Sequence, residues 1–333
     1  MGSTFMKVEN IKRIAVLGAG TMGHGIAQVC AQAGYLVHLR DTEEAALQRA
    51  MERITRNLQE LAHERITDEG KVRSTLSRIV TTTDIREALS NVDVVFEAIP
   101  ESMDLKRTIW RQISELCPNH AIMASNTSSL SITDLASVTG SANRFIGTHW
   151  MIPPHIRPLV EIVPGANTSD ETIDLVKDFF RRKLGKIVIV SKDFPGFVVN
   201  RMQLAMLREA ILLVEQGLCE IWDVDLAWTE HLGHRYCLEG PFQYADRAGL
   251  DTLCSIYDYL YTKLNDNRFR PPDSLRRKVE DGELGLKTGK GFYDYAGKSV
   301  NAILDDRDER SLHLLSHLKE LKRTDLRRKE TTR

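Results

Sequence analysis

Three polar side chains in the middle of the chain have the types and spacing needed for proton transfer. His149 lies in the segment Gly147-Thr148-His149-Trp150, and Glu161 follows twelve residues later, after a pair of prolines. A carboxylate that holds one nitrogen of an imidazole sets its tautomer and stabilises the imidazolium, so the other nitrogen can accept a proton. Ser128 lies in a polar stretch after an apolar run. We therefore expect His149 to act as a general base oriented by Glu161, with Ser128 nearby; the alternative is a buried ion pair that only stabilises the fold.

A glycine-rich turn near the N-terminus is typical of a dinucleotide site. An apolar run, 14–17, leads into Gly18-x-Gly20-x-x-Gly23. In such a turn Gly18 permits the bend, Gly20 lets the backbone approach a pyrophosphate, and Gly23 lets the next helix pack on the strand. That helix begins near Met22 and offers N–H groups to phosphates. The expected contacts are Gly18, Gly20, Thr21, Met22 and Gly23.

An acidic residue follows the second apolar run at the distance expected for a ribose contact. The run 35–39 ends just before Asp41. A carboxylate there accepts a hydrogen bond from a free ribose 2′-hydroxyl and repels a 2′-phosphate. The sequence therefore predicts NAD, rather than NADP, as the cofactor.

Composition excludes several other classes of protein. The chain has 333 residues and a formal net charge of −1, which gives no reason to expect nucleic-acid or membrane binding as a main role. Its five cysteines are scattered without a Cys-x-x-Cys pair, as in a cytoplasmic protein with reduced thiols, and no metal-binding spacing is present. No apolar run approaches the length of a membrane span.

The order of apolar segments predicts an α/β fold with two domains. Strand-like runs at 14–18, 35–39, 92–98, 120–124, 144–148, 159–163 and 186–190 alternate with amphipathic stretches. We expect a Rossmann-like, doubly wound, mostly parallel sheet over residues 8–192. A long charged segment, about 43–78, is too long for one crossover helix, so we expect a helical hairpin broken near 67–70. Its basic residues suit a phosphate-bearing carrier, although a charged face in water is an equal alternative.

After Asp193 the sequence no longer alternates between strand-like and helical segments, and helical segments follow one another. The segment 197–218 reads as one helix that is apolar nearly all round, which requires cover on every side. We expect an all-α domain over 193–296 that binds substrate and forms a homodimer. A charged tail, 297–333, carries leucines at helical spacing and is expected to form a short amphipathic helix with a frayed end.

With these motifs in order, residues 8–296 resemble the L-3-hydroxyacyl-CoA dehydrogenases. The motifs that carry the resemblance are the glycine turn at 18–23, Val95-Phe96-Glu97-Ala98-Ile99-Pro100-Glu101, Ser125-Asn126-Thr127-Ser128-Ser129, Gly147-Thr148-His149, Leu159-Val160-Glu161, Pro195-Gly196-Phe197-Val198-Val199-Asn200-Arg201, Gly240-Pro241-Phe242 and Lys287-Thr288-Gly289-Lys290-Gly291-Phe292-Tyr293. The resemblance implies NAD-dependent oxidation of an L-3-hydroxyacyl-CoA, such as 3-hydroxybutyryl-CoA, to the 3-oxoacyl-CoA.

The resemblance also assigns roles to individual residues. It makes His149 the general base, polarised by Glu161. It places Ser128 and Asn200 at the reacting oxygen of the substrate. It further implies that Glu101 and Lys106 face the nicotinamide-side ribose and that Asn126 lies near the nicotinamide.

One segment departs from the family pattern. The family usually has an Asn before the proline after its His, whereas this chain has Ile152 before Pro153-Pro154. The prolines also resemble the lambda-crystallin and L-gulonate 3-dehydrogenase branch, whose substrates carry no CoA. Arg157 could pair with a free carboxylate or face water. The alternatives are thus a dehydrogenase of a free 3-hydroxy acid, or a non-catalytic NADH-binding protein like a crystallin; the basic hairpin favours the CoA ester.

Overall fold

The computed structural model describes residues 6–331, with side chains through Leu321. These residues form two compact units that meet within one helix, the first ending at Arg208 and the second beginning at Glu209. The predicted domain boundary at 192/193 remains a prediction. Each unit is described on its own.

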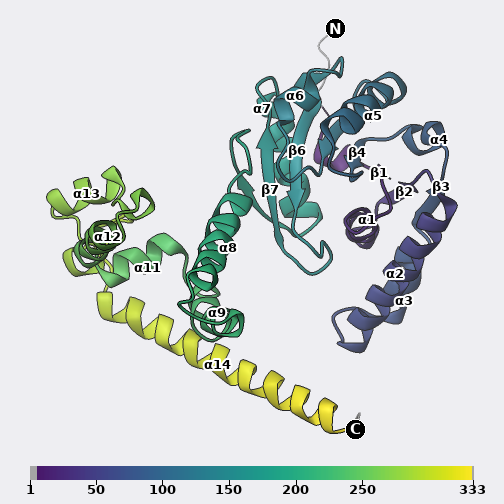
Figure 1. The fold of residues 1–333 in the computed structure, drawn as a ribbon. Helices are drawn as coiled ribbons and strands as arrows, with labels where there is room; N and C mark the ends of the chain where they lie inside the picture. Colours follow the sequence, from purple (N-terminus) through teal and green to yellow (C-terminus); the bar gives the residue numbers. More distant parts are fainter. Residues whose placement is uncertain (1–5, 332–333) are drawn as a thin grey trace. The chain divides into compact units, whose positions relative to one another are not determined.

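The first unit is built on an eight-stranded sheet with the order β3-β2-β1-β4-β5-β6-β7-β8 (Figure 1). The strands are β1 (Arg13–Leu17), β2 (Leu36–Arg40), β3 (Ile79–Thr82), β4 (Val94–Glu97), β5 (Ile122–Ser125), β6 (Phe145–Trp150), β7 (Leu159–Pro164) and β8 (Ile187–Val190). Neighbouring strands are parallel except for β6 and β7, which are antiparallel. The expected mostly parallel, doubly wound sheet is confirmed.

Helices cover both faces of this sheet, because successive strand residues point to opposite sides. Val16 belongs to the core under α1, α2 and α7, whereas Leu17 belongs to the core under α4, α5 and α6. The helices are α1 (Gly23–Gln32), α2 (Glu44–His63), α3 (Glu69–Leu76), α4 (Ile85–Leu89), α5 (Met103–Leu116), α6 (Ile132–Ala136) and α7 (Asp170–Asp178). Short single-turn segments are η1 (Val8–Asn10), η2 (Ala142–Arg144) and η3 (Phe179–Lys183). Two apolar cores therefore sandwich the sheet.

The charged segment after β2 forms the expected helical hairpin. In α2, Leu47, Ala50, Ile54 and Leu58 are buried at helical spacing, which turns one stripe toward the core. The break falls where the sequence predicts it, and the Asp68 side chain caps α3 by accepting a hydrogen bond from the N–H of Lys71 at 2.9 Å.

One strand was not predicted from the sequence. β3 directly follows the hairpin and has only two apolar residues, Ile79 and Val80, of which Val80 is exposed. Such a short run carries too little alternation to be recognised as a strand. It forms because β2 offers it a free edge, where residues 79–82 pair in parallel with residues 37–40.

The second unit is helical. Its elements are the C-terminal part of α8 (Val199–Glu215), then α9 (Ile221–Ala227), η4 (Trp228–Leu232), α10 (Gly233–Tyr236), α11 (Pro241–Ala248), α12 (Leu250–Leu264), η5 (Asn267–Phe269), α13 (Asp273–Glu280), η6 (Leu286–Thr288) and α14 (Val300–Thr331). A buried carboxylate, Asp246, organises it by accepting hydrogen bonds from the N–H groups of Phe292 and Tyr293 and from the hydroxyl of Tyr295. The expected all-α fold after the sheet is confirmed.

The tail helix is longer than expected. The sequence predicted a short helix with a frayed end, whereas α14 runs for 32 residues. No proline or glycine interrupts the sequence after Gly297, so nothing in the chain stops the helix. Among residues 6–331, no helix has the length and apolar character needed to cross a membrane.

Candidate active site

The pair of His149 and Glu161, predicted from the sequence, forms between the two antiparallel neighbouring strands of the sheet, β6 and β7. His149 and Glu161 are directly opposed in the ladder between β6 and β7. The Nδ1 atom of His149 lies 2.7 Å from Oε2 of Glu161, and both residues are buried. Since a carboxylate only accepts, Nδ1 carries the proton and Nε2 has a free lone pair. The imidazole is thus oriented as a proton acceptor.

The second oxygen of Glu161 is held by the backbone where α8 begins. Its Oε1 accepts hydrogen bonds from the N–H groups of Val198 at 3.0 Å and Val199 at 3.1 Å. Burial on its own raises the pKa of this carboxyl. The hydrogen bonds from His149, Val199 and Val198 outweigh burial, so the pKa of Glu161 lies below its usual value. Glu161 therefore remains a carboxylate at neutral pH.

Ser128 and Asn200 are brought together, as the sequence predicted. The Nδ2 atom of Asn200, in the first turn of α8, donates to the carbonyl oxygen of Ser128 at 2.9 Å. The N–H of Ser128 donates to Oε1 of Glu101 at 2.8 Å, and its Oγ lies 3.3 Å from the same oxygen. The loop after β5 is thereby fixed on two sides, with the Ser128 side chain partly accessible.

Asn126 joins that loop to the strand of the histidine. Its Oδ1 accepts the N–H of Trp150 at 3.1 Å, and its own N–H donates to the carbonyl oxygen of Glu97 at 2.8 Å. Asn126 therefore links the ends of β4, β5 and β6 through its backbone N–H and its side chain. These ends lie on the same edge of the sheet, where open α/β sheets bind ligands.

Lys106 lies in a buried cluster centred on Glu97. The ammonium of Lys106 lies 2.5 Å from Oε1 of Glu97 and 3.3 Å from Oε2 of Glu101. The other oxygen of Glu97 accepts from Oγ of Ser125 at 2.6 Å and from Nε1 of Trp110 at 3.3 Å. Every oxygen of this buried carboxylate is thus paired. Glu97 was not singled out from the sequence, although a charged residue in an apolar strand is a recognisable signal of such a cluster.

Glu101 has a partly exposed carboxylate at the mouth of this cluster. Burial on its own raises the pKa of Glu101. The hydrogen bond from Thr127, the charge of Lys106 and the hydrogen bond from the N–H of Ser128 lower it by more, so the pKa of Glu101 lies below its usual value. Glu101 is therefore a fixed negative group beside the loop of Ser128.

The glycine turn has the geometry that a pyrophosphate site requires. Gly18 has φ +101°, and a Cβ at Gly23 would lie 1.7 Å from the carbonyl oxygen of Gly18. A Cβ at Gly20, in contrast, would meet no atom within 4 Å. The three positions therefore differ: Gly18 is needed for its backbone conformation, Gly23 for close packing, and Gly20 faces open space into which a ligand can come.

Asp41 is bound to the same turn. Its Oδ2 accepts the N–H of Ala19 at 2.7 Å, and its Oδ1 accepts the N–H of Thr42 at 2.7 Å. The neighbouring Arg40 side chain donates instead to the carbonyl oxygen of Thr83 at 3.2 Å. The carboxylate is thus held at the end of β2, beside the glycines.

An open cleft of about 740 Å³ connects these groups along the sheet edge. Its lining includes Gly18, Gly20, Thr21, Met22, Asp41, Glu101, Asn126 and Ser128. The cleft has backbone N–H groups at a helix N-terminus, an acidic residue at one end and polar side chains at the other. These residues fit an extended dinucleotide such as NAD.

Among residues 6–321, the side chain of Arg157, a predicted substrate contact, makes no hydrogen bond or ion pair with the other predicted site residues. Its side chain is exposed in the loop between β6 and β7, and its described hydrogen bonds are those of its backbone: its N–H donates to the carbonyl oxygen of Pro153 at 2.9 Å, and its carbonyl oxygen accepts from Lys186 at 2.8 Å. Ile152 in the same loop is also exposed.

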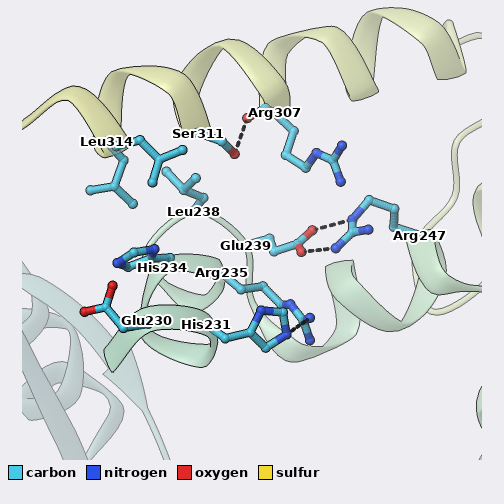
Figure 2. A pocket seen from close by; sticks show the side chains of 11 residues that line it. Glu230, His231, His234, Arg235, Leu238, Glu239, Arg247, Arg307, Ser311 and Leu314 are labelled. Carbon is cyan, nitrogen blue, oxygen red and sulfur yellow. Dashed lines mark hydrogen bonds and ion pairs between the residues drawn. The ribbon is translucent and has the colours of Figure 1, made fainter. Parts of the chain in front are cut away.

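A second, smaller pocket of about 240 Å³ lies in the helical unit (Figure 2). It is bounded by η4, α10, α11 and α14, and several of its charged groups pair with one another. Glu239 binds Arg247 through two contacts, and NH2 of Arg235 donates to Nε2 of His231 at 2.6 Å. Residues 6–331 contain no group of three or more histidine, cysteine, aspartate and glutamate side chains that could hold a metal ion.

A doubly wound sheet with a glycine turn, an acidic residue at the end of β2 and a histidine held by a carboxylate is typical of a dehydrogenase of the dinucleotide-binding class. Two protein-family models that match the chain identify the family within this class of dehydrogenases. Residues 13–194 match the 3-hydroxyacyl-CoA dehydrogenase NAD-binding domain, and residues 196–295 match the C-terminal domain of the same enzymes. The chain belongs to the 3-hydroxyacyl-CoA dehydrogenase family and is an NAD-dependent oxidoreductase.

Individual relatives agree with this assignment. The chain is 40% identical over 290 residues to the probable 3-hydroxybutyryl-CoA dehydrogenase of Bacillus subtilis, covering 87% of this chain and 99% of that protein. It is similar to the crystal structure of the 3-hydroxyacyl-CoA dehydrogenase of Archaeoglobus fulgidus, with a TM-score of 0.77, 37% identity, and coverage of 92% and 99%. It is also similar to the structure of 5-formyl-3-hydroxy-2-methylpyridine 4-carboxylic acid 5-dehydrogenase, with a TM-score of 0.69, 32% identity, and coverage of 93% and 99%.

Proposed function

We propose that the chain oxidises the 3-hydroxyl of an L-3-hydroxyacyl-CoA with a short acyl chain, such as 3-hydroxybutyryl-CoA, and that His149 removes the hydroxyl proton. The observation that carries this proposal is the 2.7 Å contact between Nδ1 of His149 and Oε2 of Glu161. That contact leaves Nε2 as the only imidazole nitrogen able to accept a proton. NAD, when bound, supplies the acceptor for the hydride that leaves C3.

The other polar residues hold the substrate and cofactor around that base. Ser128 donates its hydroxyl to the 3-oxygen, and Asn200 keeps the Ser128 loop in place while helping to hold the same oxygen. Glu161 stabilises the positive charge that develops on the imidazole. Oxidation then gives the 3-oxoacyl-CoA and a protonated His149.

The dinucleotide is held along the sheet edge. The backbone at Gly18, Gly20, Thr21, Met22 and Gly23 binds the pyrophosphate. Asp41 accepts from the adenosine ribose, which favours NAD over NADP. At the opposite end, Glu101 faces the nicotinamide-side ribose, with Lys106 behind it neutralising the charge, and Asn126 lies near the nicotinamide. The cleft that reaches from Asp41 to Ser128 supports this assignment.

A free 3-hydroxy acid is the second candidate substrate. It is favoured by the exposed guanidinium of Arg157 and by the similarity to a dehydrogenase of a pyridine carboxylic acid. The choice is tested by following NADH formation with L-3-hydroxybutyryl-CoA, a longer 3-hydroxyacyl-CoA and the corresponding free acids. Turnover of the esters and not of the acids supports our proposal. Turnover of the acids alone, lost in Arg157→Ala, would overturn it.

We further propose that the protein is a homodimer assembled through its helical unit. The support is a group of large apolar side chains exposed around α9: Leu218 is 66% exposed, Ile221 69% and Trp222 72%. Large apolar patches of this kind mark contact surfaces. A monomer mass that does not change with concentration in light scattering would contradict the dimer.

The cysteines support a reducing compartment, and we propose the cytoplasm. All five are free, and Cys30 and Cys254 are buried. Burial raises the pKa of the Cys30 thiol, which keeps it protonated and unreactive. Cell fractionation tests this location.

A further inference from the structure

A buried ammonium lies beneath the loop that follows the histidine strand. Lys186, just before β8, is only 8% exposed. Its Nζ donates to the carbonyl oxygens of Pro154 at 2.6 Å and Arg157 at 2.8 Å, and lies 5.5 Å from the centre of the Trp150 ring. These partners are dipoles and a ring face rather than carboxylates. Burial lowers the pKa of Lys186 and outweighs the opposing effect of Cys30.

The two carbonyls belong to opposite arms of one loop. Residues 151–158 connect β6, which carries His149, to β7, which carries Glu161. Pro154 lies on the arm leaving β6 and Arg157 on the arm entering β7, so one ammonium ties the arms together. The N–H of Ile187, the residue after the lysine, also donates to the carbonyl oxygen of Pro158 at 2.9 Å. The loop is thus anchored to β8 along its return arm.

The same loop also contacts the helix that follows the glycine turn. A Cβ at Gly25, in the first turn of α1, would lie only 2.9 Å from Cδ of Pro154. Close packing transmits displacements, because buried side chains leave few voids. The loop held by Lys186 therefore lies between the strand of the base and the helix whose N-terminus faces the dinucleotide cleft.

We propose that Lys186 is a positioning residue for the dehydrogenase reaction: its ammonium fixes the 151–158 loop and so sets His149 relative to the glycine turn and α1. The proposal rests on the role of His149 as the base. Without the ammonium, the carbonyl oxygens of Pro154, which is buried, and of Arg157 lose their donor, and the loop has to move to bring water to them. An error of about 1 Å in the position of a reacting group can cost about 100-fold in rate.

Lys186→Met tests the proposal in the full-length enzyme with L-3-hydroxybutyryl-CoA and NAD, because methionine retains the length and removes the donors. We expect kcat to fall about 10- to 100-fold, with both KM values within about 3-fold of wild type. Deuterium at C3 should slow the variant more than wild type, since misplacement raises the chemical barrier. Lys186→Arg should recover most of kcat, because it keeps a cation with several donors. Lys183→Met, at an exposed position three residues away, is the matched control and should be unaffected.

Several outcomes would overturn the proposal. An unchanged kcat in folded Lys186→Met would do so, as would equal losses in the Met and Arg variants with no separation of kcat from KM. If Lys186→Met does not fold, Gly25→Ala moves the same loop from the α1 side, and an unchanged kcat there would refute the proposal. His149→Gln separates the two claims: full activity in it would refute the base itself, whereas an inactive His149→Gln beside a fully active Lys186→Met would refute only the positioning role.

Discussion

The glycine turn and the His149–Glu161 pair, referred to as the glycine end and the histidine end, are built in different ways. At the glycine end, the backbone makes the site: Gly18 and Gly23 are confined by neighbouring carbonyls, and Gly20 faces open space. At the histidine end, side chains make the site: His149 and Glu161 face each other across β6 and β7, and the N–H groups of Val198 and Val199, where α8 begins, bind the second oxygen of Glu161. Under the proposed function, the glycine end binds the pyrophosphate through its backbone, and the histidine end transfers the proton. Substitutions at the two ends should therefore separate cofactor binding from turnover.

The strongest test of this contrast is His149→Gln. A glutamine keeps a polar side chain but cannot act as a base, so we expect turnover to fall about 1,000-fold, within the range for general acid–base groups. NAD affinity, measured by calorimetry, should stay within about 3-fold, because the histidine end does not hold the pyrophosphate. An equal loss of binding and turnover would mean that His149 is structural.

Gly23→Ala probes the opposite end. The added methyl would overlap the carbonyl oxygen of Gly18, and overpacking of this kind costs about 1–3 kcal/mol, so we expect NAD affinity to fall about 10- to 100-fold. At saturating NAD, kcat should remain near wild type.

Gly20→Ala is the matched control for that experiment. Its methyl meets no protein atom, so the melting temperature of the free protein should be unchanged, in contrast to Gly23→Ala. NAD binding should still weaken, because the methyl occupies the space through which the pyrophosphate approaches. Unaltered NAD affinity in Gly20→Ala would remove the glycine turn from the cofactor site.

Asp41→Ala should have a moderate effect on cofactor choice. Loss of the carboxylate removes a ribose acceptor and the repulsion of a 2′-phosphate, so the ratio of NAD to NADP efficiency should fall about 10-fold, the equivalent of about 1.4 kcal/mol. Asp41→Asn retains an acceptor for the N–H of Ala19 and controls for collapse of the turn. If the ratio is unchanged in both variants, Asp41 does not contact the ribose.

The smallest effect concerns the pH dependence of stability at the histidine end. Because the folded-state pKa of Glu161 is depressed, its contribution is complete above the ordinary carboxyl value of 4.5 and is lost as the pH falls through the lower folded value. We expect Glu161→Gln to melt about 2–4 °C below wild type at pH 7. This is the shift in melting temperature that a loss of roughly 1 kcal/mol causes in a domain of about 150–250 residues. Melting curves recorded toward pH 3 should converge. A constant difference would mean that the ionised carboxylate does not supply the stability.

Much of both ends was predictable, because their chemistry follows local patterns. The glycine spacing after an apolar strand required a tight turn and a close helix, and α1 begins at Gly23 as expected. The position of Asp41 followed from the length of one βα unit. β3 was missed, since two apolar residues give no periodicity until β2 supplies an edge to pair with. The tail helix was underestimated, because leucine spacing indicates a helix but does not set its length.

The sequence was enough to predict the class of fold, the dinucleotide turn and the two residues proposed as the base and its carboxylate, because residue type and short-range spacing carry that information. The contacts around the turn, His149 and Glu161 depend on the tertiary structure. Only the antiparallel pairing of β6 with β7 puts Glu161 directly opposite His149, and only the fold brings Lys106 to the carboxylates of Glu97 and Glu101 and the carbonyl oxygen of Ile99. Lys186 shows the limit most clearly. It gave no signal in the chain, since a lysine between a helix and a strand is ordinarily exposed, and it gains its partners only when the fold closes a loop over it.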